Sequence, residues 1–528
     1  MSARRWLVAV ALVGTLGVGA AAARWWAGEE AVRVLRARGV QWSHQHNTFD
    51  ALHLTGITGP GLTADAIHVS LLPSPTVTIQ GPVVDVRALR GKAGAVSSGG
   101  TGEGAGFVPP VHVEDLQVVW GEDTVVEGWS GSLLPMIRLS GPGGSVERTL
   151  DGTWSGSLDH PIDVGPLSGQ ATVRARCKDD CTFSVDMPEA VVEHPLLASG
   201  ALPATQLQAE LEWVDGRVDG NIQLGGVQVD ISGPVTVEPE RTAALTIEVQ
   251  DTPLQAIVDL FGDRIPEARR ARVVGTVGAS GTFSWPDQSW SLTPRADGLG
   301  VEGVLTDIDG LRNGTVTWAT LDAEGVPRMR RTGRTTPDFI PYQAAGLFPA
   351  AVLAAEDSGF SRHRGIDLVA IQAALDDARE HGVDGMRGGS TITQQLAKNL
   401  FLETRERTLA RKLRELLYAL ELDRVVPKQR ILELYMNVVE LGDNIYGVGP
   451  ASQAYFLKQP GRLTVHEAAF LAALLPAPRS RGQRAWRGGR PPKVRMGVII
   501  DNMRDLGRIS PVEAAEAHRS TLRLVPPP

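Results

Sequence analysis

Two adjacent carboxylates, Glu356 and Asp357, end an apolar segment that begins at Leu347. The spacing of its apolar residues predicts a helix over 347–355, and an acid at a helix C-terminus opposes the helix dipole. An apolar setting raises the pKa of a carboxyl group, which would suit a general base. The alternative is that both carboxylates are solvated at the helix end and have no chemical role.

A second candidate site lies where two glycines lead into a predicted helix over 391–402. The run 388–391 reads Gly-Gly-Ser-Thr, which would leave the first N–H groups of that helix free to meet an anion. Gln394 and Lys398 are four residues apart, so they share a helical face. Thr391 and Gln394 also fit a capping box, so simple helix capping is the alternative.

Cations cluster in the next predicted helix, over 407–422. Arg407, Arg411 and Lys412 could hold the oxygens of a diphosphate. Arg411 and Glu415 could equally form only an exposed i, i+4 ion pair, worth roughly 0.2–0.5 kcal/mol. A fourth stretch, over 428–449, predicts an amphipathic helix followed by a turn.

Taken together and in this order, the four stretches resemble the glycosyltransferase family 51 domain. This is the peptidoglycan-polymerising domain of class A penicillin-binding proteins and of monofunctional transglycosylases. The patterns E-D-x-x-F-x-x-H-x-G, G-G-S-T-I-x-Q-Q and R-K-x-x-E occur without a mismatch. In the pattern I-L-E-x-Y-L-N, Met436 replaces Leu. In a separate stretch, 455–458, Leu457 stands where the family's Tyr-Phe-Gly-Lys would place Gly. The match covers about 336–515, and neither departure falls on a catalytic position.

The resemblance implies a mostly α-helical, lysozyme-like domain that polymerises lipid II into β-1,4 glycan with inversion and release of undecaprenyl pyrophosphate. It implies that Glu356 is the general base toward the acceptor 4-hydroxyl and that Glu415 is a second carboxylate on the donor side. No cofactor is required, no metal ligands are assigned, and a divalent cation (Mg²⁺ or Mn²⁺) is compatible with the reaction. The residues carried over to the substrate-binding groove are Phe360, His363, Ser390, Thr391, Gln394, Gln395, Lys398, Asn399, Arg407, Arg411 and Lys412. Of these, Phe360 and His363 are expected mainly to shape the loop after Glu356.

Two other functions stay open at this point. A glycan-cleaving lytic transglycosylase or hydrolase would also use carboxylates on a helical domain. A non-enzymatic envelope scaffold or lipid-bridging protein would use the preceding part of the chain, although Glu356 and Glu415 argue against a purely structural role. A metalloprotease is a poor fit, because His466-Glu467 is followed by Phe470 where H-E-x-x-H needs a second histidine.

Residues 27–330 show a different pattern. Short stretches of alternating apolar residues, such as 76–80 and 244–249, are bounded by Gly, Pro, Asp and Asn, which predicts antiparallel strands with one buried face. In texture this region weakly resembles the strand-rich periplasmic segments of the AsmA-like family. One helix is predicted over 252–270, and a flexible Gly- and Ser-rich insertion over 91–106. The two cysteines, Cys177 and Cys181, predict a disulfide across a tight turn between two strands.

The first residues predict a membrane anchor over 1–26. Arg4 and Arg5 precede an uncharged run of 18 residues, 6–23, which would span about 27 Å as a helix. Basic residues before the run and tryptophans after it place the N-terminus in the cytoplasm. The chain would then cross the inner membrane once, with its catalytic domain on the periplasmic side. A cleaved signal peptide is the alternative, because small residues end the run.

Composition divides the remaining chain into two unlike parts. The chain of 528 residues has a net charge of −8, which does not favour a nucleic acid as partner. All five tyrosines follow residue 340, and all but two of the lysines lie from Lys398 onward. We therefore expect a β-rich domain over 27–330, a catalytic domain over 336–515 and a tail over 516–528. The expected partners are lipid II, the growing glycan strand, the membrane and other cell-wall synthesis proteins.

Overall fold

The computed structural model describes residues 36, 40–47, 51–59, 62–70, 76–85, 111–120, 123–134, 136–236, 241–321, 326–381, 388–402 and 406–525. The predicted anchor helix over 6–23 and the insertion over 91–106 lie outside the described residues, so both stay predictions. Within the described ranges, no helix combines the length and apolar character needed to cross a bilayer.

The chain divides into two compact units. One consists of Met1–Ala190 and Gln206–Ile222, and the other of Val191–Thr205 and Gln223–Pro528. In the second unit a single apolar core includes residues from Ala198 to Ala517. Late strands of the β-rich region and the helices share this core, so the division between the two compact units falls inside that region.

The first unit is built of strands. Most neighbouring strands pair antiparallel, as the alternating pattern predicts, but β6 pairs in parallel with both β4 and β5. The expectation of wholly antiparallel strands was therefore wrong at β6. Parallel neighbours need a long crossover connection, and residues 86–110 between β5 and β6 supply that length. The strands that lie wholly or mainly in this unit are β1 His44–Asn47, β2 Ala51–Gly59, β3 Leu62–Ser70, β4 Thr76–Gln80, β5 Val83–Asp85, β6 Val111–Trp120, β7 Asp123–Leu134, β8 Ile137–Gly141, β9 Gly144–Arg148, β10 Trp154–Val164, β11 Leu167–Cys177, β12 Cys181–Val192, β13 Thr205–Val214 and β14 Arg217–Leu224.

Two connections in this unit show local turn chemistry. Cys177, the last residue of β11, forms a disulfide with Cys181, the first residue of β12. Asp215 and Gly216 join β13 to β14 with φ angles of 47° and 77°, the positive values that a two-residue type I′ hairpin turn requires. The disulfide therefore reinforces the β11–β12 hairpin, and the Asp-Gly pair allows the tight turn of the β13–β14 hairpin.

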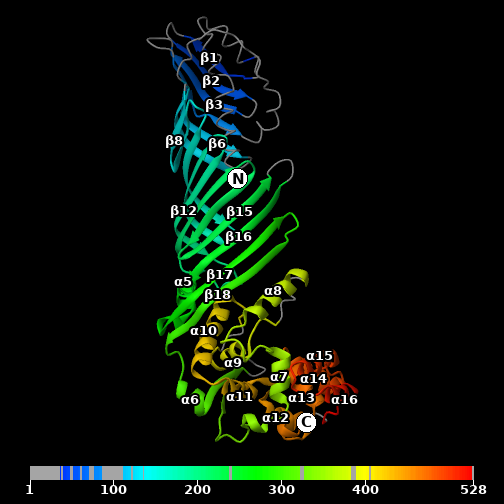
Figure 1. Ribbon diagram of the computed structural model, residues 1–528. Helices are drawn as coiled ribbons and strands as arrows, with labels where there is room; N and C mark the ends of the chain where they lie inside the picture. The colour runs from blue at the N-terminus through cyan, green and yellow to red at the C-terminus, as the bar shows by residue number, and fades with distance from the viewer. Residues whose placement is uncertain are drawn as a thin grey trace. The chain divides into compact units, whose positions relative to one another are not determined.

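The second unit begins with four strands that lie side by side (Figure 1). They are β15 Val227–Thr236, β16 Thr242–Pro253, β17 Ala271–Trp285 and β18 Trp290–Gly303. Leu245, Phe283 and Trp290 are cross-strand partners in β16, β17 and β18, so they share one face. The next row, Thr246 and Thr282, is polar and faces the other way. This is the two-residue period that the sequence predicts.

The helix predicted over 252–270 is only partly helical. α5 spans Leu254–Phe261 and is followed by short 3₁₀ turns over Gly262–Arg264 and Pro266–Arg269. Gly262 has a φ of 49°, outside the helical range, and Pro266 lacks the N–H that an α-helix would use. The expected single helix therefore breaks after Phe261.

Helices form the rest of the second unit, joined by a hairpin of β19 Val316–Leu321 and β20 Pro327–Thr332 and a small ribbon of β21 Glu440–Gly442 and β22 Ile445–Tyr446. α13 is the central helix, because its residues from Ala468 to Leu474 are completely buried. The helices are α6 Ile308–Asn313, α7 Phe348–Glu356, α8 Leu368–His381, α9 Ile392–Phe401, α10 Leu409–Val425, α11 Lys428–Val438, α12 Val448–Phe456, α13 Val465–Leu474, α14 Pro478–Gly488, α15 Lys493–Asp505 and α16 Pro511–Arg519.

Three of these helices give little signal in the sequence. α12 contains Gly449 and Pro450 near its start, and α14 is rich in Arg and Gly with no apolar period. α16 continues into the segment expected to be a tail, and beyond it the N–H of Val525 donates to the carbonyl of Tyr455. Packing against the core stabilises these helices where intrinsic preference does not.

Candidate active site

Side chains from three other helices meet around Glu356, the last residue of α7. The Arg495 guanidinium from α15 lies 2.6 Å from Oε1 of Glu356, and the Gln395 amide from α9 donates to Oε2 at 3.0 Å. The Tyr435 hydroxyl from α11 donates to Oε1 of Gln395 at 2.8 Å, which fixes the orientation of that amide. The Glu356 side chain keeps 14% of its surface exposed. Its carboxylate is therefore held in one direction yet remains accessible.

The electrostatic setting of Glu356 suits a base. Burial raises the pKa of Glu356, and the hydrogen bond from Gln395 and the charges of Arg495 and Arg481 oppose this effect without cancelling it. Burial also raises the pKa of Tyr435 well above its usual value, so the phenol stays a neutral donor. A carboxylate with increased proton affinity can accept a proton from a hydroxyl group more readily than a solvated one.

A second buried carboxylate, Glu415 in α10, holds two cations. Glu415 is 1% exposed, and its Oε1 forms an ion pair with the Arg411 guanidinium. Its Oε2 lies 2.7 Å from the ammonium of Lys412, which also donates to the Ser390 hydroxyl at 2.7 Å. The alternative of an exposed Arg411–Glu415 pair is wrong, because the Arg411 side chain is only 12% exposed. This network connects α10 to the residues that precede α9.

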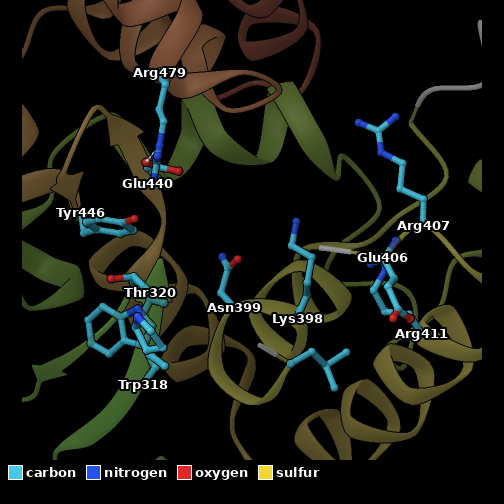
Figure 2. A pocket seen from close by; sticks show the side chains of 14 residues that line it. Trp318, Thr320, Lys398, Asn399, Glu406, Arg407, Arg411, Glu440, Tyr446 and Arg479 are labelled. Atoms are coloured by element: carbon cyan, nitrogen blue, oxygen red, sulfur yellow. Dashed lines mark hydrogen bonds and ion pairs between the residues drawn. The ribbon is translucent and has the colours of Figure 1, made fainter. Parts of the chain in front are cut away.

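A positively charged cavity of about 480 Å³ lies beside this network (Figure 2). Lys398 and Asn399 from α9 project into it, and Arg407 and Arg411 lie on one side. Burial, together with the charge of Arg411, lowers the pKa of Lys398. A neighbouring anion would relieve this repulsion. The opposite wall consists of Trp318, Thr320, Glu440, Tyr446 and Arg479.

Glu356 itself opens onto a second cavity, of about 390 Å³. Asp357, Ser390 and Thr391 also line this space, together with Asn502 of α15. Ser390 therefore lines the cavity at Glu356 and also belongs to the cation network, since it accepts a hydrogen bond from Lys412. Through Ser390, the cavity at Glu356 and the cation network of α10 adjoin each other.

Thr391 and Gln394 form the capping box that the sequence allows. Thr391 Oγ1 accepts from the N–H of Gln394, and Gln394 Oε1 accepts from the N–H of Thr391. The N–H of Ile392 donates to Asp357 at 3.0 Å. The interpretation of this helix start as a free anion site is therefore wrong for these three N–H groups. Both side chains are buried and stabilise α9.

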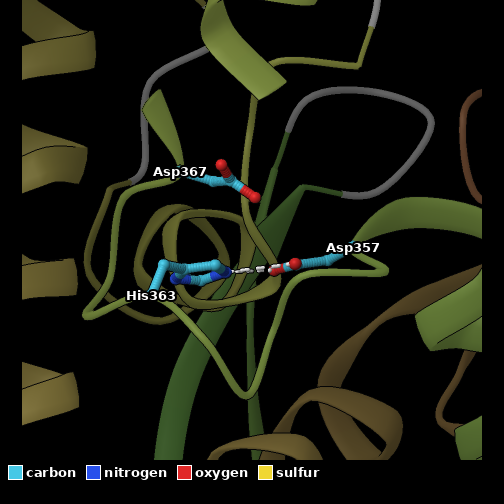
Figure 3. A group of neighbouring side chains, drawn as sticks. All are labelled: Asp357, His363 and Asp367. Carbon is cyan, nitrogen blue, oxygen red and sulfur yellow. Dashed lines mark hydrogen bonds and ion pairs between the residues drawn. The ribbon is translucent and has the colours of Figure 1, made fainter. Parts of the chain in front are cut away.

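Asp357, which follows Glu356 in the chain, lies together with His363 and Asp367 (Figure 3). Nε2 of His363 lies 3.1 Å from both carboxylate oxygens of Asp357, and Asp367 accepts from two N–H groups in the first turn of α8. One ligand atom from each lies within 4.8 Å of the others. Because protein donors already use both carboxylates, we interpret the group as a structural brace and assign it no metal.

The loop that follows Glu356 is shaped by packing. Phe360 is buried, and the Lys428 ammonium lies 4.4 Å from the centre of its ring. His363 is likewise buried in its contact with Asp357. Both side chains therefore pack within the loop that follows Glu356.

Arg495, a residue of the candidate site, was not predicted from the sequence. Arg495 contacts Glu356 and also donates to the carbonyl of Ala355, and on the same helix Asn502 donates to the carbonyl of Ala354. The apolar period of 493–506 predicts the helix but does not show which element it packs against. Only the contact between α15 and α7 brings Arg495 to Glu356.

Comparisons with known proteins place the similarity in the helical part of the chain. A family model described as transglycosylase matches residues 331–504, which include Glu356 and Glu415. The biosynthetic peptidoglycan transglycosylase of Shewanella amazonensis is 53% identical over 128 residues, which cover 24% of this chain and 51% of that protein. The protein of the same name from Stutzerimonas stutzeri is 40% identical over 194 residues, covering 36% of this chain and 74% of that protein.

A longer relative matches the same part. Penicillin-binding protein 1A of Aquifex aeolicus is 44% identical over 186 residues, which cover 34% of this chain and 24% of that protein. The chain spans 51% and 58% of the length of the first two transglycosylases that it matches. The similarity therefore concerns one region of each protein.

Proposed function

Because this chain belongs to the transglycosylase family, we propose that it is a peptidoglycan glycosyltransferase that joins lipid II units into β-1,4 glycan and releases undecaprenyl pyrophosphate. The observation that carries the proposal is the combination of an oriented, largely buried Glu356 with a cationic cavity lined by Lys398, Arg407 and Arg411. A base for a hydroxyl group and cations for a departing diphosphate are the two things that this transfer needs.

Glu356 acts as the general base in the proposed reaction. Its carboxylate accepts the proton of the acceptor GlcNAc 4-hydroxyl while the hydroxyl oxygen forms a bond to the anomeric carbon of the donor. The bond from that carbon to the pyrophosphate oxygen breaks, and the electron pair leaves with the pyrophosphate. Attack on the face opposite the leaving group turns the α-linked donor into a β-linkage. Arg495 and Gln395 keep the carboxylate aimed during this step.

The cations act on the donor side. Lys398, Arg407 and Arg411 neutralise the charge that grows on the pyrophosphate as it leaves. Both oxygens of Glu415 are engaged in ion pairs, so we propose that Glu415 acts by holding Arg411 and Lys412 and not by carrying a proton. This gives the two carboxylates of the site separate tasks.

The proposed substrate places the protein at a membrane. Lipid II is carried on a prenyl chain, and the uncharged run 6–23 would anchor the chain in the same inner membrane with the catalytic part on the periplasmic side. The proposed partners are lipid II, the growing glycan strand and other cell-wall synthesis proteins.

Two substrates test the proposed function. The full chain should convert lipid II into polymeric glycan and should release no soluble fragments from polymeric peptidoglycan, with both products followed by gel and mass spectrometry. Release of fragments without polymerisation would instead support the glycan-cleaving alternative.

Arg495→Gln should move the acid limb of the pH–rate profile to higher pH. Glu356 works in its ionised form, so activity falls as pH drops through its pKa. The Arg495 charge lowers that pKa, and its removal lets burial raise it further. Initial rates of lipid II polymerisation across pH measure the shift. Arg504→Gln, an exposed change on the same helix, is the control, and an acid limb that does not move in Arg495→Gln contradicts the assigned role of Glu356.

A further inference from the structure

The helix α10, which carries Glu415, forms hydrogen bonds and an ion pair with residues that precede the matched segment 331–504 in the sequence. Glu267, in the 3₁₀ turn after α5, accepts three contacts from the Arg414 guanidinium, at 3.0, 2.9 and 2.7 Å. Glu267 is 3% exposed, and the Tyr418 phenol also hydrogen-bonds to it. A bidentate, buried pair of this kind holds its helix in one orientation.

The first turn of α10 is fixed by the backbone. The N–H of Leu409 donates to the carbonyl of Leu196 at 2.7 Å, and the N–H of Ala410 donates to the carbonyl of Leu197 at 2.9 Å. Thr408 caps the same turn through the N–H of Arg411. Segment 191–205 therefore supplies acceptors that the helix itself lacks at this end.

The last turns of α10 are fixed as well. Glu421 is completely buried, and it accepts from the N–H of Leu305 at 2.6 Å and from the Thr306 hydroxyl at 2.8 Å. The Arg424 guanidinium donates to the carbonyl of Gly303, where β18 ends beside α10 (Figure 1). Contacts from the strand-rich part of this unit thus run along the whole helix.

These contacts occupy one stripe of α10, and the cation network occupies the next. Arg414, Tyr418 and Glu421 follow the helical period, Lys412 and Glu415 lie further around the helix, and Arg411 lies between these two groups. A helix of this length is rigid, so contacts that fix one stripe of α10 also fix the direction in which the neighbouring stripe faces. Arg414 and Glu415 are neighbours in the sequence, so a movement of the backbone at Arg414 also moves Glu415.

We infer that Glu267 is a positioning residue for glycosyl transfer, because through Arg414 it sets the rotation of α10 and hence the place where Arg411 and Lys412 meet the donor diphosphate. This inference rests on the proposed function. Glu267 lies outside the matched segment 331–504. The strand-rich part of the second unit therefore contributes to catalysis by holding the cations of α10 in position.

Glu267→Gln in the full chain tests the inference with two measurements that do not need turnover. Hydrogen–deuterium exchange over residues 409–425 should become faster, while exchange in α15 should not change. The Kd for inorganic pyrophosphate, measured by calorimetry, should rise several-fold, up to about tenfold. Glu248→Gln is the matched control, since Glu248 pairs with Arg295 at 2.6 Å on the strands of the same unit and should change neither quantity.

A purely structural role predicts a different result. A partly unfolded population would lower the number of binding sites but leave the Kd for pyrophosphate unchanged, which would overturn the inference even if exchange became faster. Unchanged exchange over 409–425 would also overturn it. Arg414→Lys is the second variant in case Glu267→Gln fails to fold. It keeps the positive charge but loses the planar guanidinium that contacts both carboxylate oxygens of Glu267, and it should show a smaller rise in the Kd for pyrophosphate. Failure of the proposed function is seen separately, as no glycan from lipid II with the unaltered protein.

Discussion

Glu356→Gln should lower the rate of lipid II polymerisation by roughly 10²–10⁴-fold, which is the typical contribution of a general base. Glutamine keeps the shape of the side chain and can still accept the hydrogen bond from Gln395, but it cannot take a proton from the acceptor hydroxyl. Burial already disfavours the charged form of Glu356, so a neutral amide should be tolerated. Arg495 loses its partner but is about a third exposed and can be solvated.

The measurement is the initial rate of glycan formation from lipid II, together with the melting temperature. Glu467→Gln is the matched control, because Glu467 pairs with Lys458 and caps α13 without lining either cavity. Near-normal synthesis by Glu356→Gln, with a normal melting temperature, would remove Glu356 from the role of base.

Glu415→Gln should reduce both stability and activity. The change leaves Arg411 buried without its anion, and breaking a buried ion pair costs on the order of 3 kcal/mol. Lys412 is 41% exposed, so it would turn to solvent and leave Ser390. The cations would then no longer be placed for the leaving diphosphate, and kcat/KM for lipid II should fall roughly 10²-fold.

Glu433→Gln separates these two effects. Glu433 is also buried and lies 2.6 Å from Arg430, but it lines neither cavity. Denaturant unfolding should show a similar loss of stability in both variants, whereas only Glu415→Gln should lose rate per folded molecule. A Glu415→Gln protein that polymerises lipid II at the normal rate would show that the ion pairs are structural alone.

Local features of the site follow closely from the sequence. The apolar periods predict α7, α9, α10 and α15, and the Thr391–Gln394 capping box forms as its spacing allows. The alternating pattern predicts strands whose cross-strand partners share a face, such as Leu245 and Phe283. All these signals arise between residues that are close in the chain, so neighbouring residues are enough to reveal them.

Other features depend on partners that local spacing does not identify. Asp357 accepts a hydrogen bond from the N–H of Ile392 at the start of α9, so this N–H group is not free for an anion. The Arg411–Glu415 pair has the spacing of a surface pair but is buried by the packing of α10. In the first unit, β6 pairs in parallel with β4 and β5, and the alternating pattern of a strand does not specify the direction of its neighbour.

The sequence by itself determined the residue types of the site, the helices that carry them and the two kinds of structure in the chain. Only the tertiary structure decided which groups meet. Glu356 and Arg495 are 139 residues apart, and Glu267 and Arg414 are 147 apart. A helical period specifies which face of an element is apolar, but it does not specify which element covers that face. The choice of partner is made by the packing of the whole core, and that packing holds the carboxylate of Glu356 in one orientation and brings Lys398, Arg407 and Arg411 together at one cavity.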